Sequence, residues 1–261
     1  ISFVDIAGLV KGASKGEGLG NKFLSHIREV DAVIHMIRCF DSDDIQNVNI
    51  TVDPVRDLEI IETEMMLADL ESIQKRLEKN NKKNIDSEQL KILETSLDCI
   101  NNSRDINILQ DKFEKKLLRQ SGLLSLKPKI FVCNVDEASV QSGNTYTKAF
   151  IEKFEEKNTL IVSADIENQI NELDISEKKN YMERIGLKKT GLDMLIQKGY
   201  KILELDTYFT SGPEETRAWT IQKNCTAPKA AGEIHTDFEK GFIRAETVSY
   251  EDFVANDGWN K

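Results

Sequence analysis

The first stretch with residue types that could do chemistry is "DIAG", in which Asp5 stands three positions before Gly8. A carboxylate that directly follows an apolar run can hold Mg²⁺ through a water molecule. Gly8 has no side chain, so a backbone N–H there could approach a terminal phosphate closely. The pattern predicts a contact to Mg²⁺ and phosphate; its structural alternative is a simple aspartate at a strand-to-turn junction.

A second pattern, "CNVDE", follows a later apolar run and places Asn134 three residues before Glu137. This is the spacing at which an amide and a carboxylate can clamp a purine base. In the guanine-specific form, N-K-x-D, the aspartate accepts hydrogen bonds from N1–H and the 2-amino group of guanine. Here the acid is one methylene longer and Val135 replaces the lysine, which points away from strict guanine recognition. Ser163 and Ala164, in "VSAD", are expected to support the base.

Strands must position these residues, and four apolar runs are predicted as strands: residues 1–4, 32–37, 129–133 and 160–162. Helical patterns, among them residues 19–29 and 147–157, alternate with these runs. Polar or small residues follow three of the runs, as expected at the carboxyl ends of strands in an open α/β sheet. The order of elements therefore predicts a mostly parallel, doubly wound sheet.

A long helical stretch separates the second and third predicted strands. Two apolar stripes at helical spacing are interrupted by the polar segment "NNKKN" at residues 80–84. We expect an antiparallel, coiled-coil-like hairpin that projects as an arm; the alternative is ordinary packing on the sheet. The stripes are Thr63, Met66, Leu67, Leu70, Ile73 and Leu77, and then Leu90, Leu93, Leu97 and Ile100.

The last part of the chain has a different pattern. From Leu203, the stretches "TYFTSGPEETRAWTI", "AAGEIHTDF" and "GFIRAETVSY" alternate in the manner of strands between glycine and proline residues. We therefore predict a small, β-rich appended domain.

Composition limits the class of protein. The net charge of -10 argues against a protein that coats nucleic acid by bulk electrostatics. Scattered cysteines without a C-x-x-C pair, and no apolar run of about 20 residues, predict a soluble, cytoplasmic protein with reduced thiols. One stretch is locally basic, although a solvated helix face is the simpler interpretation. Its residues are Lys112, Lys115, Lys116, Arg119, Lys127 and Lys129.

Two long stretches carry a family resemblance: "FVDIAGLVKGASKGEGLGNKFLSHIREVDAVIHMIRCF" and "KAAGEIHTDFEKGFIRAE". They resemble the YchF, or Obg-like ATPase, family of P-loop proteins, and the similarity runs over essentially the whole chain. The resemblance implies an incomplete Ras-like nucleotide-binding domain (residues 1–57 and 124–202), a helical coiled-coil arm (58–123) and a partial β-grasp TGS domain (203–261).

The same resemblance implies a function. Members of the family prefer ATP or accept both ATP and GTP, which predicts a Mg²⁺-dependent nucleotide-switch ATPase associated with the ribosome. Two alternatives stay open: a GTPase of the same fold, and a module that binds the ribosome or RNA while hydrolysis is incidental. We expect neither a membrane nor DNA as a partner, and the oligomeric state is not predicted.

Site roles follow from the resemblance, motif by motif. Asp5 and Gly8 become the switch contacts to Mg²⁺ and the γ-phosphate. Leu9 stands where many Ras-like GTPases carry a water-orienting glutamine, and Asn47 stands where several bacterial relatives carry a histidine. The catalytic residue is therefore unidentified. The base contacts become Asn134, Val135 and Glu137, with Ser163 and Ala164 as the supporting loop.

The phosphate-binding loop itself is missing from the sequence. No Gly-Lys dipeptide occurs, so G-x-x-x-x-G-K-[ST] is not present. We expect this loop and the switch threonine upstream of Ile1, and the end of the TGS domain beyond Lys261. We also expect the chain by itself to bind ATP weakly or not at all, because the loop supplies most phosphate-binding energy.

Overall fold

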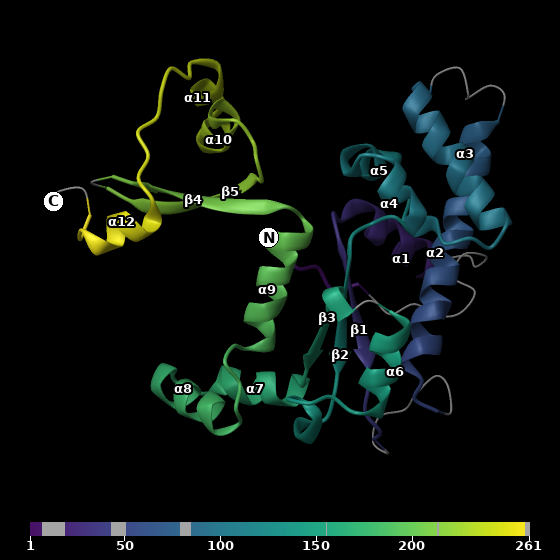
Figure 1. Cartoon of the computed structure of the whole chain (residues 1–261), viewed down its shortest axis with the longest axis horizontal. Helices are drawn as coiled ribbons and strands as arrows, with labels where there is room; N and C mark the ends of the chain where they lie inside the picture. Colours follow the sequence, from purple (N-terminus) through teal and green to yellow (C-terminus); the bar gives the residue numbers. More distant parts are fainter. Residues whose placement is uncertain (7–18, 43–50, 79–84, 155, 213, 259–261) are drawn as a thin grey trace. The chain divides into compact units, whose positions relative to one another are not determined.

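A computed structural model describes residues 1–6, 19–42, 51–78, 85–154, 156–212 and 214–258 (Figure 1). The chain divides into two compact units, residues 1–203 and residues 204–261. Within the described ranges, no helix combines the length and the apolar character needed to cross a membrane.

A three-stranded parallel sheet forms the centre of the first unit (Figure 1). Its strands, in their order across the sheet, are β1 (Val33–Arg38), β2 (Lys129–Asn134) and β3 (Thr159–Val162). These strands confirm three of the four runs predicted from the sequence. The register pairs Asn134 with Arg38 on one side and with Val162 on the other, so all three strands end at one edge.

Helices provide the crossovers that a parallel sheet requires. The first unit contains α1 (Leu19–Glu29), α2 (Pro54–Leu77), α3 (Ser87–Asn101), α4 (Leu109–Lys112), α5 (Lys115–Ser121), α6 (Thr145–Lys153), α7 (Ala164–Glu172), α8 (Ile175–Arg184) and α9 (Gly191–Ile202). Single 3₁₀ turns are η2 (Ile106–Ile108), η3 (Glu137–Ser139) and η4 (Glu156–Asn158). Helix α2 shows how the local sequence determines where a helix begins. Pro54 occupies its first turn, and the Asp53 carboxylate accepts a hydrogen bond from the Arg56 N–H at 3.0 Å.

Helices pack on both faces of the sheet. On one face, Leu58 of α2 and Phe150 of α6 pack with Ile37 of β1. On the other face, α9 packs through Leu195 against the cluster that contains Ile130 of β2. The first unit is therefore a three-layer α/β/α structure, which confirms the predicted α/β class.

The strand predicted at residues 1–4 is wrong. Residues 1–6 belong to no strand, and the apolar side chains of Ile1, Phe3 and Val4 are 49%, 49% and 64% exposed. A parallel strand needs a hydrogen-bonded neighbour and a buried face, and this run has neither among the described residues. Asp5 accordingly follows an extended segment and not a strand.

The predicted stripe on α2 is wrong in its first half. Thr63 is exposed and Leu67 is 37% exposed, whereas Met65, Ala68 and Asp69 are buried. The helix contacts the sheet layer through its first half. Its second half packs with α3, α4 and α5 around a cluster that includes Ile73, Ile92, Leu93, Cys99, Leu109 and Leu118.

The described residues of the second unit form an antiparallel hairpin and three helices. These are β4 (Leu205–Ser211), β5 (Thr216–Gln222), α10 (Ala227–Ile234), α11 (Thr236–Lys240) and α12 (Tyr250–Ala255). The strand pattern proposed for "AAGEIHTDF" is wrong, because Pro228 in the first turn and alanines start a helix there. No strand forms in "GFIRAETVSY" either. The Tyr208 hydroxyl donates to the Ala230 carbonyl at 2.9 Å and ties α10 to β4.

Candidate functional site

The carboxyl edge of the sheet brings together the loops after β1, β2 and β3. The Cys39 N–H donates to the Asn134 carbonyl at 2.8 Å, and the Val135 N–H donates to the Val162 carbonyl at 2.9 Å. These backbone bonds extend the strand pairing by one residue into the loops. In open α/β sheets, this is the edge at which ligands bind.

Asn134 is fixed at this edge by its side chain. Its Oδ1 atom accepts from the Ala164 N–H at 2.9 Å, at the start of α7. Because a backbone N–H can only donate, the atom of Asn134 that faces it must be the oxygen. The amide NH₂ group is left to donate. Purine N7 is an acceptor in both adenine and guanine, so this donor suits either base.

Glu137 is exposed and begins the turn η3. Its Oε1 atom accepts from Nε2 of Gln169 on α7 at 2.5 Å, and Oε1 of Gln169 accepts from the Tyr181 hydroxyl of α8 at 2.5 Å. Sequence reasoning missed Gln169 and Tyr181. Both lie in polar helical segments, and their involvement depends on how α7 and α8 pack beside η3, which no local pattern indicates.

Two predicted contact residues lie in the interior instead of on the surface of the site. Val135 is 2% exposed and packs with Cys39 and Phe150, and Ser163 is 1% exposed. The Ser163 hydroxyl oxygen has no hydrogen-bond partner among the described residues. In this structure both side chains therefore pack in the interior, under the loops that follow β2 and β3.

The phosphate half of the predicted site is only partly described. Asp5 is exposed, in the segment that precedes residue 7. Gly8, Leu9 and Asn47 lie outside the described residues. The structure thus brings Asn134, Glu137 and Ala164 to one edge of the sheet, with the buried side chain of Ser163 directly before Ala164.

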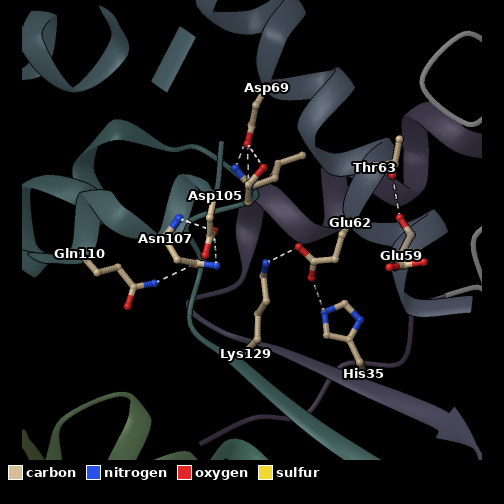
Figure 2. A network of polar contacts seen from close by, with 11 residues as sticks. His35, Glu59, Glu62, Thr63, Asp69, Asp105, Asn107, Gln110 and Lys129 are labelled. Atoms are coloured by element: carbon tan, nitrogen blue, oxygen red, sulfur yellow. Dashed lines mark hydrogen bonds and ion pairs between the residues drawn. The ribbon is translucent and has the colours of Figure 1, made fainter. Parts of the chain in front are cut away.

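A second polar cluster lies near the amino ends of the strands (Figure 2). The Lys129 ammonium of β2 lies 2.6 Å from Oε2 of Glu62 on α2, and Nε2 of His35 on β1 lies 3.9 Å from Oε1 of that carboxylate. Burial, reinforced by the charge of Lys129, lowers the pKa of His35 to about 3. The Lys129–Glu62 pair attaches α2 to the sheet, whereas His35 Nε2 has no hydrogen-bond partner among the described residues. A histidine held neutral in this way is not suited to proton transfer near neutral pH.

Asp69 also ties α2 to the chain that leads into β2 (Figure 2). Its carboxylate accepts from the backbone N–H of Leu124 at 2.8 Å, from that of Ser125 at 2.8 Å and from the Ser125 hydroxyl at 2.6 Å. Burial raises the pKa of Asp69, and these hydrogen bonds oppose the shift. Three donors match an acceptor-only carboxylate, so the group is structural.

The locally basic stretch divides into two parts. Lys129 is paired with Glu62, and Lys127 donates to the carbonyls of Arg28, at 3.0 Å, and Val30. The other four residues are exposed on α4 and α5: Lys112, Lys115, Lys116 and Arg119. The six residues therefore do not form one basic surface.

Two family models match the chain. MMR_HSR1, described as a 50S ribosome-binding GTPase, matches residues 1–63. YchF-GTPase_C, described as a protein of unknown function, matches residues 205–261. With the parallel sheet, these matches define the class: an α/β protein of the P-loop GTPase-like fold.

Curated relatives identify the family. The "Ribosome-binding ATPase YchF" of Bacillus subtilis (strain 168) is 46% identical over 98% of this chain and 73% of the relative. The protein of the same name from Escherichia coli O157:H7 is 44% identical over 99% of this chain and 73% of the relative. A solved structure of the Schizosaccharomyces pombe YchF GTPase superposes with a TM-score of 0.73 at 34% identity, over 97% of this chain and 71% of that one. This chain belongs to the YchF family.

Proposed function

We propose that this protein is a ribosome-associated nucleotide switch that hydrolyses ATP with Mg²⁺. The observation that carries the proposal is the carboxyl edge of the sheet, where Asn134 is held by Ala164 and Glu137 stands beside it. The printed names of the curated relatives, ribosome-binding ATPases, agree with it. A protein that binds ribosomes would act in the cytoplasm.

The base half of the site supports purine binding. Asn134 offers a donor that purine N7 of either base can accept, so the choice between bases falls to Glu137. The aspartate of N-K-x-D, one methylene shorter than a glutamate, would suit the two donors of guanine. Glu137 is longer and already accepts from Gln169, which supports ATP as the substrate.

Asp5 is the proposed protein carboxylate for Mg²⁺. In phosphate-transfer sites Mg²⁺ uses one or two carboxylates, with waters and substrate phosphates completing its shell. Asp5 is exposed and fits that part, and no group of three or more His, Cys, Asp or Glu within the described ranges could hold a metal. Bound there, Mg²⁺ would neutralise charge that develops on the phosphates. Gly8 remains the proposed backbone contact to the γ-phosphate.

We assign the domains as follows. Residues 1–57 and 124–202 form the nucleotide-binding domain, residues 58–123 form a coiled-coil arm, and residues 203–261 form part of a TGS domain. The packing of α2 with α3 around Ile73 and Ile92 supports the arm, and the β4–β5 hairpin supports a β-grasp unit. The arm and the TGS domain are the proposed ribosome contacts, with RNA as a second candidate partner.

GTP is the competing substrate, because the S. pombe relative is described as a GTPase. Calorimetry with ATP and GTP on the full-length gene product separates the two. We expect ATP to bind more tightly, and Asn134→Ala to weaken both nucleotides. A preference for GTP of tenfold or more would overturn the ATPase assignment.

Ribosome binding needs its own measurement. We expect co-sedimentation with ribosomes to depend on the bound nucleotide if the protein is a switch. Binding that is unchanged with and without nucleotide would favour the alternative, a ribosome- or RNA-binding module in which hydrolysis is incidental.

A further inference from the structure

Glu137 is not an isolated carboxylate at the end of β2. Gln169 of α7 donates to its Oε1 atom at 2.5 Å, and Tyr181 of α8 donates to Gln169 at 2.5 Å. We propose that Gln169, oriented by Tyr181, sets the base preference of this site by occupying one oxygen of Glu137. The proposal rests on the proposed function, since it takes a purine base to bind at this edge.

The direction of each hydrogen bond in this relay from Tyr181 through Gln169 to Glu137 follows from which groups can donate and which can accept. An ionised carboxylate can only accept, so Gln169 must turn its NH₂ group toward Glu137. Its carbonyl oxygen then faces Tyr181, and the phenol must donate. Both functional groups of the Gln169 amide are used, so the amide cannot rotate without losing two bonds.

The helices hold both ends of the relay in place. Gln169 lies on α7 between Ile166 and Ile170, which are 3% and 1% exposed and anchor that helix in the core. Helix α8 starts at a capping box, in which Asp174 accepts from the N–H of Glu177 at 2.9 Å. The donor to Glu137 is therefore placed by α7, which is anchored in the core, and Tyr181 of α8 accompanies it through the hydrogen bond to Gln169.

The two purines differ in what they ask of Glu137. Guanine presents two adjacent donors, N1–H and the 2-amino group, which together match the two oxygens of one carboxylate. Adenine presents one donor group, the 6-amino group. Because Gln169 already donates to Oε1, guanine would have to share that oxygen to use both of its donors, whereas adenine lacks N1–H and the 2-amino group and does not need both oxygens. The relay therefore disfavours the second donor of guanine.

Inosine triphosphate tests this mechanism directly, because hypoxanthine keeps N1–H and lacks the 2-amino group. In the wild-type full-length protein we expect GTP and ITP to bind with nearly equal affinity. In Gln169→Leu both oxygens of Glu137 become available, so GTP should bind roughly tenfold more tightly than ITP, the effect of one additional hydrogen bond to a charged group. Tyr181→Phe should move the GTP:ITP ratio in the same direction by less.

Asn168→Leu is the matched control, since Asn168 is the exposed neighbour of Gln169 on the same helix. It should keep the wild-type ratio. The proposal is overturned if wild-type protein already binds GTP tenfold more tightly than ITP, or if Gln169→Leu keeps the wild-type ratio while circular dichroism shows an intact fold. If Gln169→Leu does not fold, Tyr181→Phe decides by the same ratio.

Asn134→Ala separates this proposal from the function on which it rests. If this variant weakens ATP and GTP alike while Gln169→Leu changes nothing, the relay is wrong and the base site stands. If Asn134→Ala leaves both affinities unchanged, or neither nucleotide binds, then no base occupies this edge and both ideas fail.

Discussion

His35 should make the stability of the first unit depend on pH. Burial, with the charge of Lys129 as a second cause, lowers the pKa of His35 from 6.5 to about 3. The Glu62 carboxylate, 3.9 Å away, acts in the opposite direction, but Lys129 balances its charge at 2.6 Å. The folded protein therefore keeps His35 neutral at pH values at which the unfolded chain protonates it.

The sign and size of the effect follow from this difference. The contribution of neutral His35 to stability is fully present above the unfolded pKa and is lost as pH falls toward the folded pKa. Between pH 6.5 and pH 5 the unfolded chain comes to bind about one proton more than the folded chain. A difference of one proton changes the free energy of unfolding by about 1.4 kcal/mol per pH unit. Lowering the pH from 7 to 5 should therefore cost about 2 kcal/mol through this one side chain.

Urea unfolding at pH 5, 6 and 7 measures this loss. Circular dichroism at 222 nm is the suitable probe, because both tryptophans, Trp219 and Trp259, lie in the second unit. His35→Leu should remove about 2 kcal/mol of the pH dependence. His26→Gln, at an exposed histidine of α1, is the control and should keep the wild-type slope. An unchanged slope in His35→Leu would refute the claim that His35 is buried in its neutral form.

Two further experiments test how α2 is attached. Asp69→Ala leaves the buried N–H groups of Leu124 and Ser125 without their acceptor, at about 1–3 kcal/mol each, so urea unfolding should show a loss of roughly 2–6 kcal/mol. A loss below about 1 kcal/mol would mean that water replaces the carboxylate. Lys129→Met should destabilise by about 2–3 kcal/mol, less than a fully buried pair because Glu62 is 23% exposed, and adding Glu62→Gln should restore most of it. No recovery in the double variant would contradict the pairing.

The sequence was sufficient for features that repeat along the chain. Three strands have apolar runs of the correct length, and Asn134 and Ser163, at the ends of two of these runs, mark the carboxyl edge of the sheet. Asn134 and Glu137 could be found because their spacing is local to one loop. The class of fold, and the placing of Asn134 and Glu137 at one edge of the sheet, are therefore predictable from the sequence, whereas the burial of Val135 and Ser163 is not.

Other features depend on contacts between distant segments. The stripe on α2 was misplaced because Asp69 and Glu64 lie on its buried face, and a search for apolar residues passes over them. The strand at residues 1–4 failed because an apolar run becomes a strand only beside a hydrogen-bonded neighbour. The relay from Tyr181 through Gln169 to Glu137 joins η3 to two later helices, so only the packed structure reveals it.

The groups expected to contact a base are held by other groups of the protein. Asn134 is hydrogen-bonded to Ala164, and Glu137 is hydrogen-bonded to Gln169. Binding of a base at this edge therefore needs little further ordering of these side chains. Fixed donors and acceptors should select a base independently of its phosphates. We therefore expect the same ratio of adenine to guanine affinity for triphosphates, diphosphates and monophosphates, within about threefold. Calorimetry with ATP, ADP and AMP against GTP, GDP and GMP measures the three ratios. A preference confined to triphosphates would show that the choice of base is made through the phosphate contacts and not by Glu137.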